Sequence, residues 1–187
     1  MTEITLLMGL WLLWGVSWVV AALWAAPAEK RPPLREEALY RGLAVIAALL
    51  IFWRPGDAGL LWVIDPVADW ILVGVTAAGL AFTWWARIHL GELWSGDITR
   101  KAGHHIVDTG PYRIVRHPIY TGLLIAFYAT ALHRGTALAL AGAALATAGL
   151  YVKARLEERF LSAELGPAYR SYSRRVPMLV PFLPTRG

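Results

Sequence analysis

The chain has 187 residues, of which 57% are hydrophobic and 17% charged, whereas soluble domains average about 25% charged residues. It contains no cysteine, which excludes disulfides, thiolate metal sites and cysteine nucleophiles. The net charge of +5 is spread between long apolar blocks, a pattern that favours a lipid headgroup surface over nucleic acid as the partner. A helix of about 20 residues crosses a bilayer, so the sequence predicts an all-α, polytopic transmembrane bundle.

Five apolar blocks, in chain order, cover residues 4–26, 38–53, 67–86, 119–132 and 135–152. The first block follows Glu3 and has no basic segment before it, so it is predicted to be a span and not a cleavable signal peptide. Only His133 and Arg134 separate the last two blocks, which predicts a helical hairpin. The last block carries Gly142 and Gly149 at helical spacing, and we expect them to form a packing face for a neighbouring helix. Most of the ten tryptophans are expected to be interfacial anchors.

Lysine and arginine alternate between the two sides of this arrangement. The segments before, between and after the five blocks carry, in order, 0, 4, 1, 5, 1 and 7 of these residues. The positive-inside rule then predicts five spans with the N-terminus outside and the C-terminus in the cytoplasm. Most ionisable groups lie in two cytoplasmic stretches, residues 87–117 and 153–187, and function is expected there.

The first stretch leads into the fourth block through Arg116, His117 and Pro118. Proline suits the first turn of a helix, and the free amides at such a start favour an anionic ligand group. Tyr120 follows with a hydroxyl and a ring, and Gly122 leaves room beside the backbone. An ordinary helix start with interfacial side chains would show the same residues.

The second stretch continues the fifth helix to about residue 165. Glu157 and Glu158 lie one or two turns beyond the apolar block, and Lys153 is spaced to pair with Glu157. Gly166 and the proline after it are expected to end the helix. The proline-rich apolar tail at residues 176–184 is expected to lie in the membrane interface as a lid. Between helix and tail stand two tyrosines and two arginines, Tyr169, Tyr172, Arg174 and Arg175.

The run GPYRIVRHPIYTG, followed by EERFL, GPAYRSY and RRVPMLVP, resembles the isoprenylcysteine carboxyl methyltransferase family, in its bacterial form. The resemblance covers about half of the chain, from residue 90 to 181, and includes the WSG and HHIV pieces of the preceding loop. Residues 1–66 resemble nothing in particular. We therefore expect one membrane domain, with variable N-terminal spans at 1–66 and a methyltransferase-like core at 67–187.

The family implies S-adenosylmethionine as the cofactor. Carried over by motif, the cofactor-binding residues are His104, Arg116, His117, Tyr120, Gly122, Glu157, Tyr169 and Tyr172. For catalysis, Arg174 or Arg175 would orient a carboxylate acceptor, and Glu158 or His104 would serve as a base for an amine or alcohol. No metal is expected, because the loop spacing of the histidines does not suit a zinc site.

This residue set suits the chemistry of the cofactor. A zwitterionic amino-acid end needs both signs of charge, and a sulfonium is stabilised by aromatic faces. Methyl transfer depends on positioning and a dry site. The expected acceptor is lipophilic, most naturally the carboxylate of an isoprenoid-type or other lipid, in a bacterial inner membrane. Two alternatives stay open: an NADPH-dependent enzyme resembling sterol reductases, and a non-catalytic transport or assembly protein.

Overall fold

The computed structural model describes residues 2–23, 34–53, 59–94 and 106–183. These residues form five α-helices and two short 3₁₀ helices. The α-helices are α1 (Glu3–Ala22), α2 (Leu34–Phe52), α3 (Pro66–Leu90), α4 (Pro118–Arg134) and α5 (Ala137–Arg175), and the 3₁₀ helices are η1 (Gly91–Leu93) and η2 (Gly110–Arg113). The described part of the chain contains no β-strand, only an isolated bridge between Leu60 and Thr136. The prediction of an all-α protein is confirmed.

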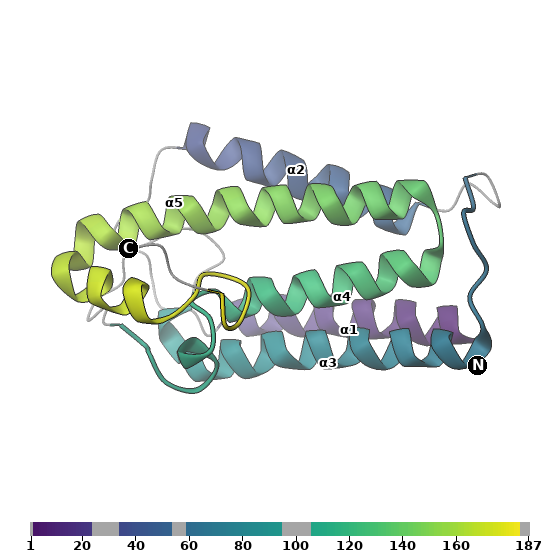
Figure 1. The fold of residues 1–187 in the computed structure, drawn as a ribbon, viewed down its shortest axis with the longest axis horizontal. Coiled ribbons are helices and arrows are strands. Elements are labelled where there is room, and N and C mark those ends of the chain that lie inside the picture. The colour runs from purple at the N-terminus through teal and green to yellow at the C-terminus, as the bar shows by residue number, and fades with distance from the viewer. Residues whose placement is uncertain (1, 24–33, 54–58, 95–105, 184–187) are drawn as a thin grey trace.

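The five α-helices lie side by side along the long axis, and the start of α1 and the last part of α5 lie at opposite ends of the bundle (Figure 1). Helices α1, α3 and α5 are each long and apolar enough to cross a membrane. Helix α4 is shorter, with 17 residues, and α2 carries charges in its first two turns. Large apolar side chains point outward, such as Leu12 and Leu13 of α1, which are 69% and 68% exposed. Such a surface suits lipid and not water, so the chain is an integral membrane protein.

Capping residues fix the hairpin between α4 and α5. Helix α4 ends at Gly135, whose φ of 62° is left-handed, and a side chain there would collide with the carbonyl oxygen of Trp62. Thr136 then caps α5 by accepting a hydrogen bond from the backbone N–H of Ala139 at 3.2 Å. The predicted tight helical hairpin is therefore confirmed.

Small residues set the closest helix contacts. A Cβ atom added to Gly142 of α5 would lie 2.9 Å from the carbonyl oxygen of Ala47 in α2. Between α3 and α4 the approach is closer still, because a Cβ atom on Gly79 would lie 2.7 Å from the carbonyl oxygen of Gly122. The predicted packing face of the fifth helix is confirmed, and α2 is the helix that it contacts.

Several tryptophans lie inside the bundle. The indole of Trp11 donates a hydrogen bond to Thr130 of α4 at 2.9 Å, and that of Trp14 donates to Thr83 of α3 at 2.7 Å. Trp84 of α3 donates back to Ser17 of α1. These three residues contact other helices through their indoles, whereas the prediction of interfacial anchoring was made for most of the ten tryptophans. Their N–H groups find partners on other helices, so they attach α1 to the bundle.

The polar end of the bundle is built by the last part of α5, η2 and the tail (Figure 1). The charge-free part of α5 ends at Val152, and the helix continues beyond it. At Gly166 the backbone leaves helical geometry, with φ 57° and ψ −128°, as the Gly–Pro pair predicts. A second helical segment then runs to Arg175, which the sequence analysis did not anticipate. This kink brings the end of α5 back toward the start of α4.

Candidate active site

A cavity of about 330 Å³ opens at the polar end of the bundle, which is within the size range of small-ligand sites. The residues that line the cavity come from α1, the end of α3, η1, η2, α4 and α5. From the start of α4 and the loop before it come Arg116, His117, Pro118, Ile119, Tyr120 and Leu123; from α5 come Leu150, Lys153, Glu157, Phe160, Leu161, Leu165, Tyr169 and Tyr172. The predicted stretches, 87–117 and the segment after 152, therefore meet at one site.

The C-terminal tail packs against the beginning of α4. The backbone N–H groups of Arg116 and His117 donate hydrogen bonds to the carbonyl oxygens of Pro177 and Met178, at 2.8 and 3.1 Å. The hydroxyl of Thr121 donates to the carbonyl oxygen of Leu179 at 2.6 Å. These two amides lie just before the first turn of α4, which begins at Pro118. The tail holds the helix start in place.

Arg116 links the three parts of the site. Its Nε atom donates to Glu158 Oε1 at 2.6 Å, and its NH2 atom lies 2.5 Å from the same oxygen. Its NH1 atom donates to the carbonyl oxygens of Ser173 and Val176, at 2.7 and 2.6 Å. All three guanidinium nitrogens are engaged, and the side chain is only 10% exposed. Arg116 therefore fixes the second segment of α5 against α4, and its hydrogen bonds are used within the protein.

His117 lies between two carboxylates. Its Nδ1 atom is 3.3 Å from Glu157 Oε2, and its Nε2 atom is 3.3 Å from Glu158 Oε1. The ring stacks on Tyr120, with centroids 5.3 Å apart and planes inclined by 2°. The Tyr120 hydroxyl donates to Glu157 Oε1 at 2.5 Å. These contacts hold the Glu157 carboxylate at the cavity wall.

The carboxylates control the protonation of His117. Burial favours the neutral imidazole, but hydrogen bonds to Glu157 and Glu158 outweigh it, so the pKa of His117 is raised. Burial likewise disfavours the charged carboxylates, yet His117 beside them lowers the pKa of both Glu157 and Glu158. The contacts therefore favour the protonated form of His117 and the ionised forms of both carboxylates.

Replacing His117 with glutamine is expected to change how stability depends on pH. A raised native pKa means that His117 contributes fully below the pKa of its unfolded form, about 6.5, and that this contribution disappears as pH rises through the native value. The two glutamates stay ionised between pH 6 and 9, because their pKa values are lowered. In detergent, the difference in melting temperature between wild type and His117→Gln should be largest near pH 6 and should shrink toward pH 9. A difference that is constant or grows with pH would contradict this assignment.

Three tyrosines close the cavity on the side of the kinked segment. The Tyr172 hydroxyl donates to the carbonyl oxygen of Tyr112 in η2 at 2.7 Å. Tyr169 packs edge-on against Tyr172, with centroids 6.0 Å apart. Burial raises the pKa of all three phenols, so they stay neutral. They offer ring faces and hydroxyls to a ligand.

Lys153 is a cavity residue that the sequence analysis did not select. Its ammonium lies 5.3 Å from the ring centroid of Tyr40 and 5.5 Å from that of Tyr120, and its charge contributes to the lowered pKa of Glu157. Its spacing of one helical turn before Glu157 was visible in the sequence, where it suggested only a surface ion pair. The structure makes it a cation on the cavity wall.

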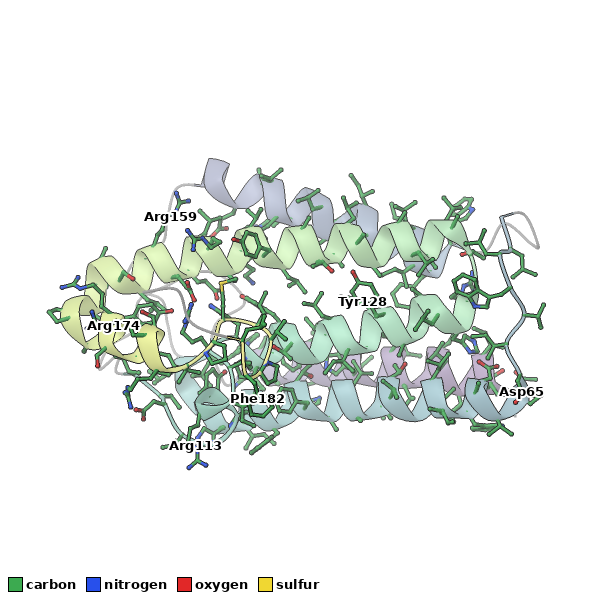
Figure 2. All side chains as sticks on the ribbon, viewed as in Figure 1. Asp65, Arg113, Tyr128, Arg159, Arg174 and Phe182 are labelled. Carbon is green, nitrogen blue, oxygen red and sulfur yellow. The ribbon has the colours of Figure 1, made fainter. Side chains whose placement is uncertain are left out.

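Four of the predicted site residues lie elsewhere. Gly122 faces α3, where the backbone and Thr83 fill the space that its missing side chain leaves. Glu158 lies behind Glu157 and binds Arg116. Arg174 and Arg175 are exposed and do not line the cavity; Figure 2 shows Arg174 on the returning segment at the polar end. His104 lies outside the described residues.

Three tryptophans also line the cavity, and only one of them belongs to a motif of the family resemblance. Trp14 and Trp18 come from α1, and Trp94 follows η1. The signal for the first two was their spacing of four residues on one helix face. This spacing did not distinguish a cavity wall from an interfacial anchor, because tryptophan is also common at membrane interfaces.

Comparison with known proteins supports the resemblance. The family model described as "Isoprenylcysteine carboxyl methyltransferase (ICMT) family" matches residues 71–163. The chain is 36% identical to methanethiol S-methyltransferase 2 of Bradyrhizobium diazoefficiens, over 85% of this chain and 67% of that protein. It is 30% identical to protein-S-isoprenylcysteine O-methyltransferase B of Arabidopsis thaliana, over 75% of this chain and 70% of that protein. The chain belongs to the isoprenylcysteine carboxyl methyltransferase family.

A third relative in this methyltransferase family is the methanethiol S-methyltransferase of Mycobacterium tuberculosis, which is 36% identical over 81% of this chain. The match spans about two thirds of the length of these relatives. The region matched by the family model contains the charged cluster at Arg116, His117, Glu157 and Glu158. The tryptophans of α1 and the kinked segment with its tyrosines lie outside that region.

Proposed function

We propose that this protein transfers a methyl group from S-adenosylmethionine to a lipophilic acceptor that reaches the cavity from the membrane. The observation that carries the proposal is the cavity itself. Its wall presents a carboxylate at Glu157, an ammonium at Lys153 and the rings of Tyr120, Tyr169 and Tyr172. Both signs of charge beside aromatic faces suit a zwitterionic nucleoside cofactor with a cationic sulfur.

The roles of the charged residues follow from their contacts. Glu157 lines the cavity and would bind the ammonium group of the cofactor. Lys153, one helical turn earlier, would attract the carboxylate, because the hydrogen bonds of Arg116 are directed to Glu158 and the backbone of the kinked segment. The neutral tyrosines would pack against the adenine and the sulfonium.

The chemistry is an in-line displacement, for which the protein supplies position and a dry environment. The bound cofactor would supply the methyl group from its sulfonium, whose sulfur would keep the electron pair of the broken bond. A thiol acceptor would react as its thiolate, having released its proton to solvent before it reached the dry site. The tyrosines line the site at its polar end, where their rings would help to exclude water from the bound cofactor.

We propose a small apolar thiol as the acceptor. Relatives from two bacteria are named methanethiol S-methyltransferases, and a cavity of about 330 Å³ is near the lower end of the range for drug-sized ligands. An isoprenoid carboxylate is the second candidate, favoured by the name of the Arabidopsis relative. The basic stretches and the polar end of the bundle support a site on the cytoplasmic side of a bacterial inner membrane.

Replacing Glu157 with glutamine should weaken cofactor binding by about tenfold or more, because a hydrogen bond to a charged group contributes roughly 1.5–3 kcal/mol. Lys153→Ala should weaken it in the same direction. Calorimetry on the purified protein in detergent measures both effects, and exposed Arg159 of the same helix, labelled in Figure 2, gives the control variant Arg159→Ala.

The same titration with NADPH separates the methyltransferase from a reductase. Selective binding of NADPH, or equal affinities for S-adenosylmethionine in Glu157→Gln and Arg159→Ala, would count against the proposed function.

A further inference from the structure

The cavity has a second, apolar end that the proposed cofactor contacts do not use. Trp14 and Trp18 of α1, Trp94 after η1, Leu123 of α4 and Leu150 of α5 line it. Leu150 precedes Glu157 by two helical turns on α5, so Leu150 lies in the apolar part of that helix. An acceptor that enters from lipid would meet this end first.

The first indole of this wall is fixed from behind. Trp14 Nε1 donates a 2.7 Å hydrogen bond to the hydroxyl of Thr83, a fully buried residue of α3. Trp18 stacks on Trp14, with ring centroids 4.8 Å apart and an interplanar angle of 26°. The two rings therefore form one continuous surface that is attached to α3.

The second side of the wall is held by a buried arginine. Trp18 meets Trp94 edge to face, at 5.6 Å and 90°, and the guanidinium of Arg87 lies 4.3 Å from the ring centroid of Trp94. Arg87 is 2% exposed and donates to the carbonyl oxygens of Ala21 and Gly91, at 2.7 and 2.8 Å. This arginine joins the end of α1 to the end of α3. The wall cannot move without breaking these contacts.

A rigid wall limits the length of an acceptor. The whole cavity is about 330 Å³, and a nucleoside cofactor would fill most of a site of that size. The indoles of Trp14 and Trp18 are part of the cavity lining and would bound the space that a cofactor leaves for an acceptor. A flexible aliphatic wall would adapt to longer chains, whereas these rings are held by hydrogen bonds, stacking and a cation.

We infer that Trp14, Trp18 and Trp94 form a size filter, which restricts the methyl acceptor to short apolar chains, and that Trp18 is its specificity-determining residue. This inference rests on the proposed function. Trp18 is the residue to change because it contacts both of the other rings, and ring packing is what it contributes. Truncation at Trp14 would also remove a hydrogen bond.

The test compares acceptors of increasing length in Trp18→Ala and wild type. Purified protein receives S-adenosylmethionine with methanethiol, butanethiol or octanethiol, and mass spectrometry measures the methylated products. Wild type should prefer the short thiols, and Trp18→Ala should raise the rate with octanethiol relative to methanethiol by about tenfold or more, the effect of burying two or more further methylene groups.

Trp11 provides a matched control on the same helix. It stacks on Phe127 at 5.0 Å and donates a hydrogen bond to Thr130, but it does not line the cavity. Trp11→Ala therefore removes a comparable amount of packing and should leave the length preference unchanged. A wild type that accepts octanethiol as well as methanethiol, or an equal shift in Trp11→Ala, would overturn the inference.

A binding measurement separates the filter from the proposed acceptor. In S-butyl and S-hexyl analogues of the cofactor, a longer alkyl chain replaces the transferable methyl group. Calorimetry of their binding therefore measures how well the apolar end of the cavity accommodates a chain, without any methyl transfer. Trp18→Ala should bind the hexyl analogue at least about tenfold better, relative to S-adenosylmethionine, than wild type does. If the cofactor binds but no thiol is methylated, the proposal of a thiol acceptor fails. The affinities of the alkyl analogues then still test whether the tryptophans form a size filter. If S-adenosylmethionine does not bind at all, the proposed function fails and the filter with it.

Discussion

Replacing Arg116 with alanine is expected to cost about 3–5 kcal/mol of unfolding free energy, the range for breaking a buried ion pair by removing one partner. Arg116 and Glu158 are 10% and 13% exposed. Without the guanidinium, the imidazole of His117 is the remaining partner of the Glu158 carboxylate among the described residues. The carbonyl oxygens of Ser173 and Val176 lose their donor as well.

The same substitution should detach the returning segment of α5. Arg116 contacts that segment directly, and Tyr169 and Tyr172 of the cavity wall lie on it. We expect Arg116→Ala to lose S-adenosylmethionine binding together with stability, and to expose the chain after Gly166 to protease. Thermal unfolding in detergent and limited proteolysis measure the two effects.

Two other variants calibrate this prediction. Arg116→Lys keeps the charge but cannot reproduce the fork of donors that reaches a carboxylate and two carbonyls at once, so we expect an intermediate loss. Arg175 lies on the same segment, is 63% exposed and sits 3.5 Å from Asp108; exposed pairs of this kind contribute about 0–1 kcal/mol. If Arg175→Ala were as harmful as Arg116→Ala, Arg116 would not have the linking role that its contacts indicate.

The sequence was sufficient to predict the helices and the end of the molecule where charged groups gather. Apolar blocks of about bilayer length predicted each helix to within a few residues at most ends, because the hydrocarbon core demands such blocks. The family motif placed Arg116, His117, Tyr120 and Glu157 on one site, and the structure brings these residues to one cavity. Their roles in binding remain predictions.

Contacts between distant segments could not be predicted in this way. Whether Trp14 faces lipid or a cavity depends on where α3 and α4 lie, and an indole in an apolar block gives the same signal in both cases. The engagement of Arg116 depends on residues about 60 positions later in the chain, which return only because of the kink at Gly166. Likewise, the gap at Gly122 suggested a ligand in the sequence, and it is filled by α3.

Replacing Gly79 with alanine is the other substitution for which we expect a large effect. A Cβ atom there would lie 2.7 Å from the carbonyl oxygen of Gly122 and 3.0 Å from the backbone nitrogen of Ala126. Both neighbours are backbone atoms of α4, so a rotamer change cannot relieve the collision and the helices must separate. Helices in lipid associate through such close approaches of small residues, and overpacking typically costs about 1–3 kcal/mol.

Gly74 provides the matched control, because it lies on the same helix and a Cβ atom there would meet nothing within 4 Å. Gly74→Ala should leave stability unchanged or raise it by up to about 1 kcal/mol, since alanine favours a helix over glycine. Thermal unfolding of both variants in the same detergent makes the comparison direct. Equal stabilities would show that α3 and α4 can separate without cost. The separation should also reach the cavity, because Thr83 and Arg87 of α3 hold Trp14 and Trp94; Gly79→Ala should therefore loosen the acceptor-length preference that Gly74→Ala leaves intact.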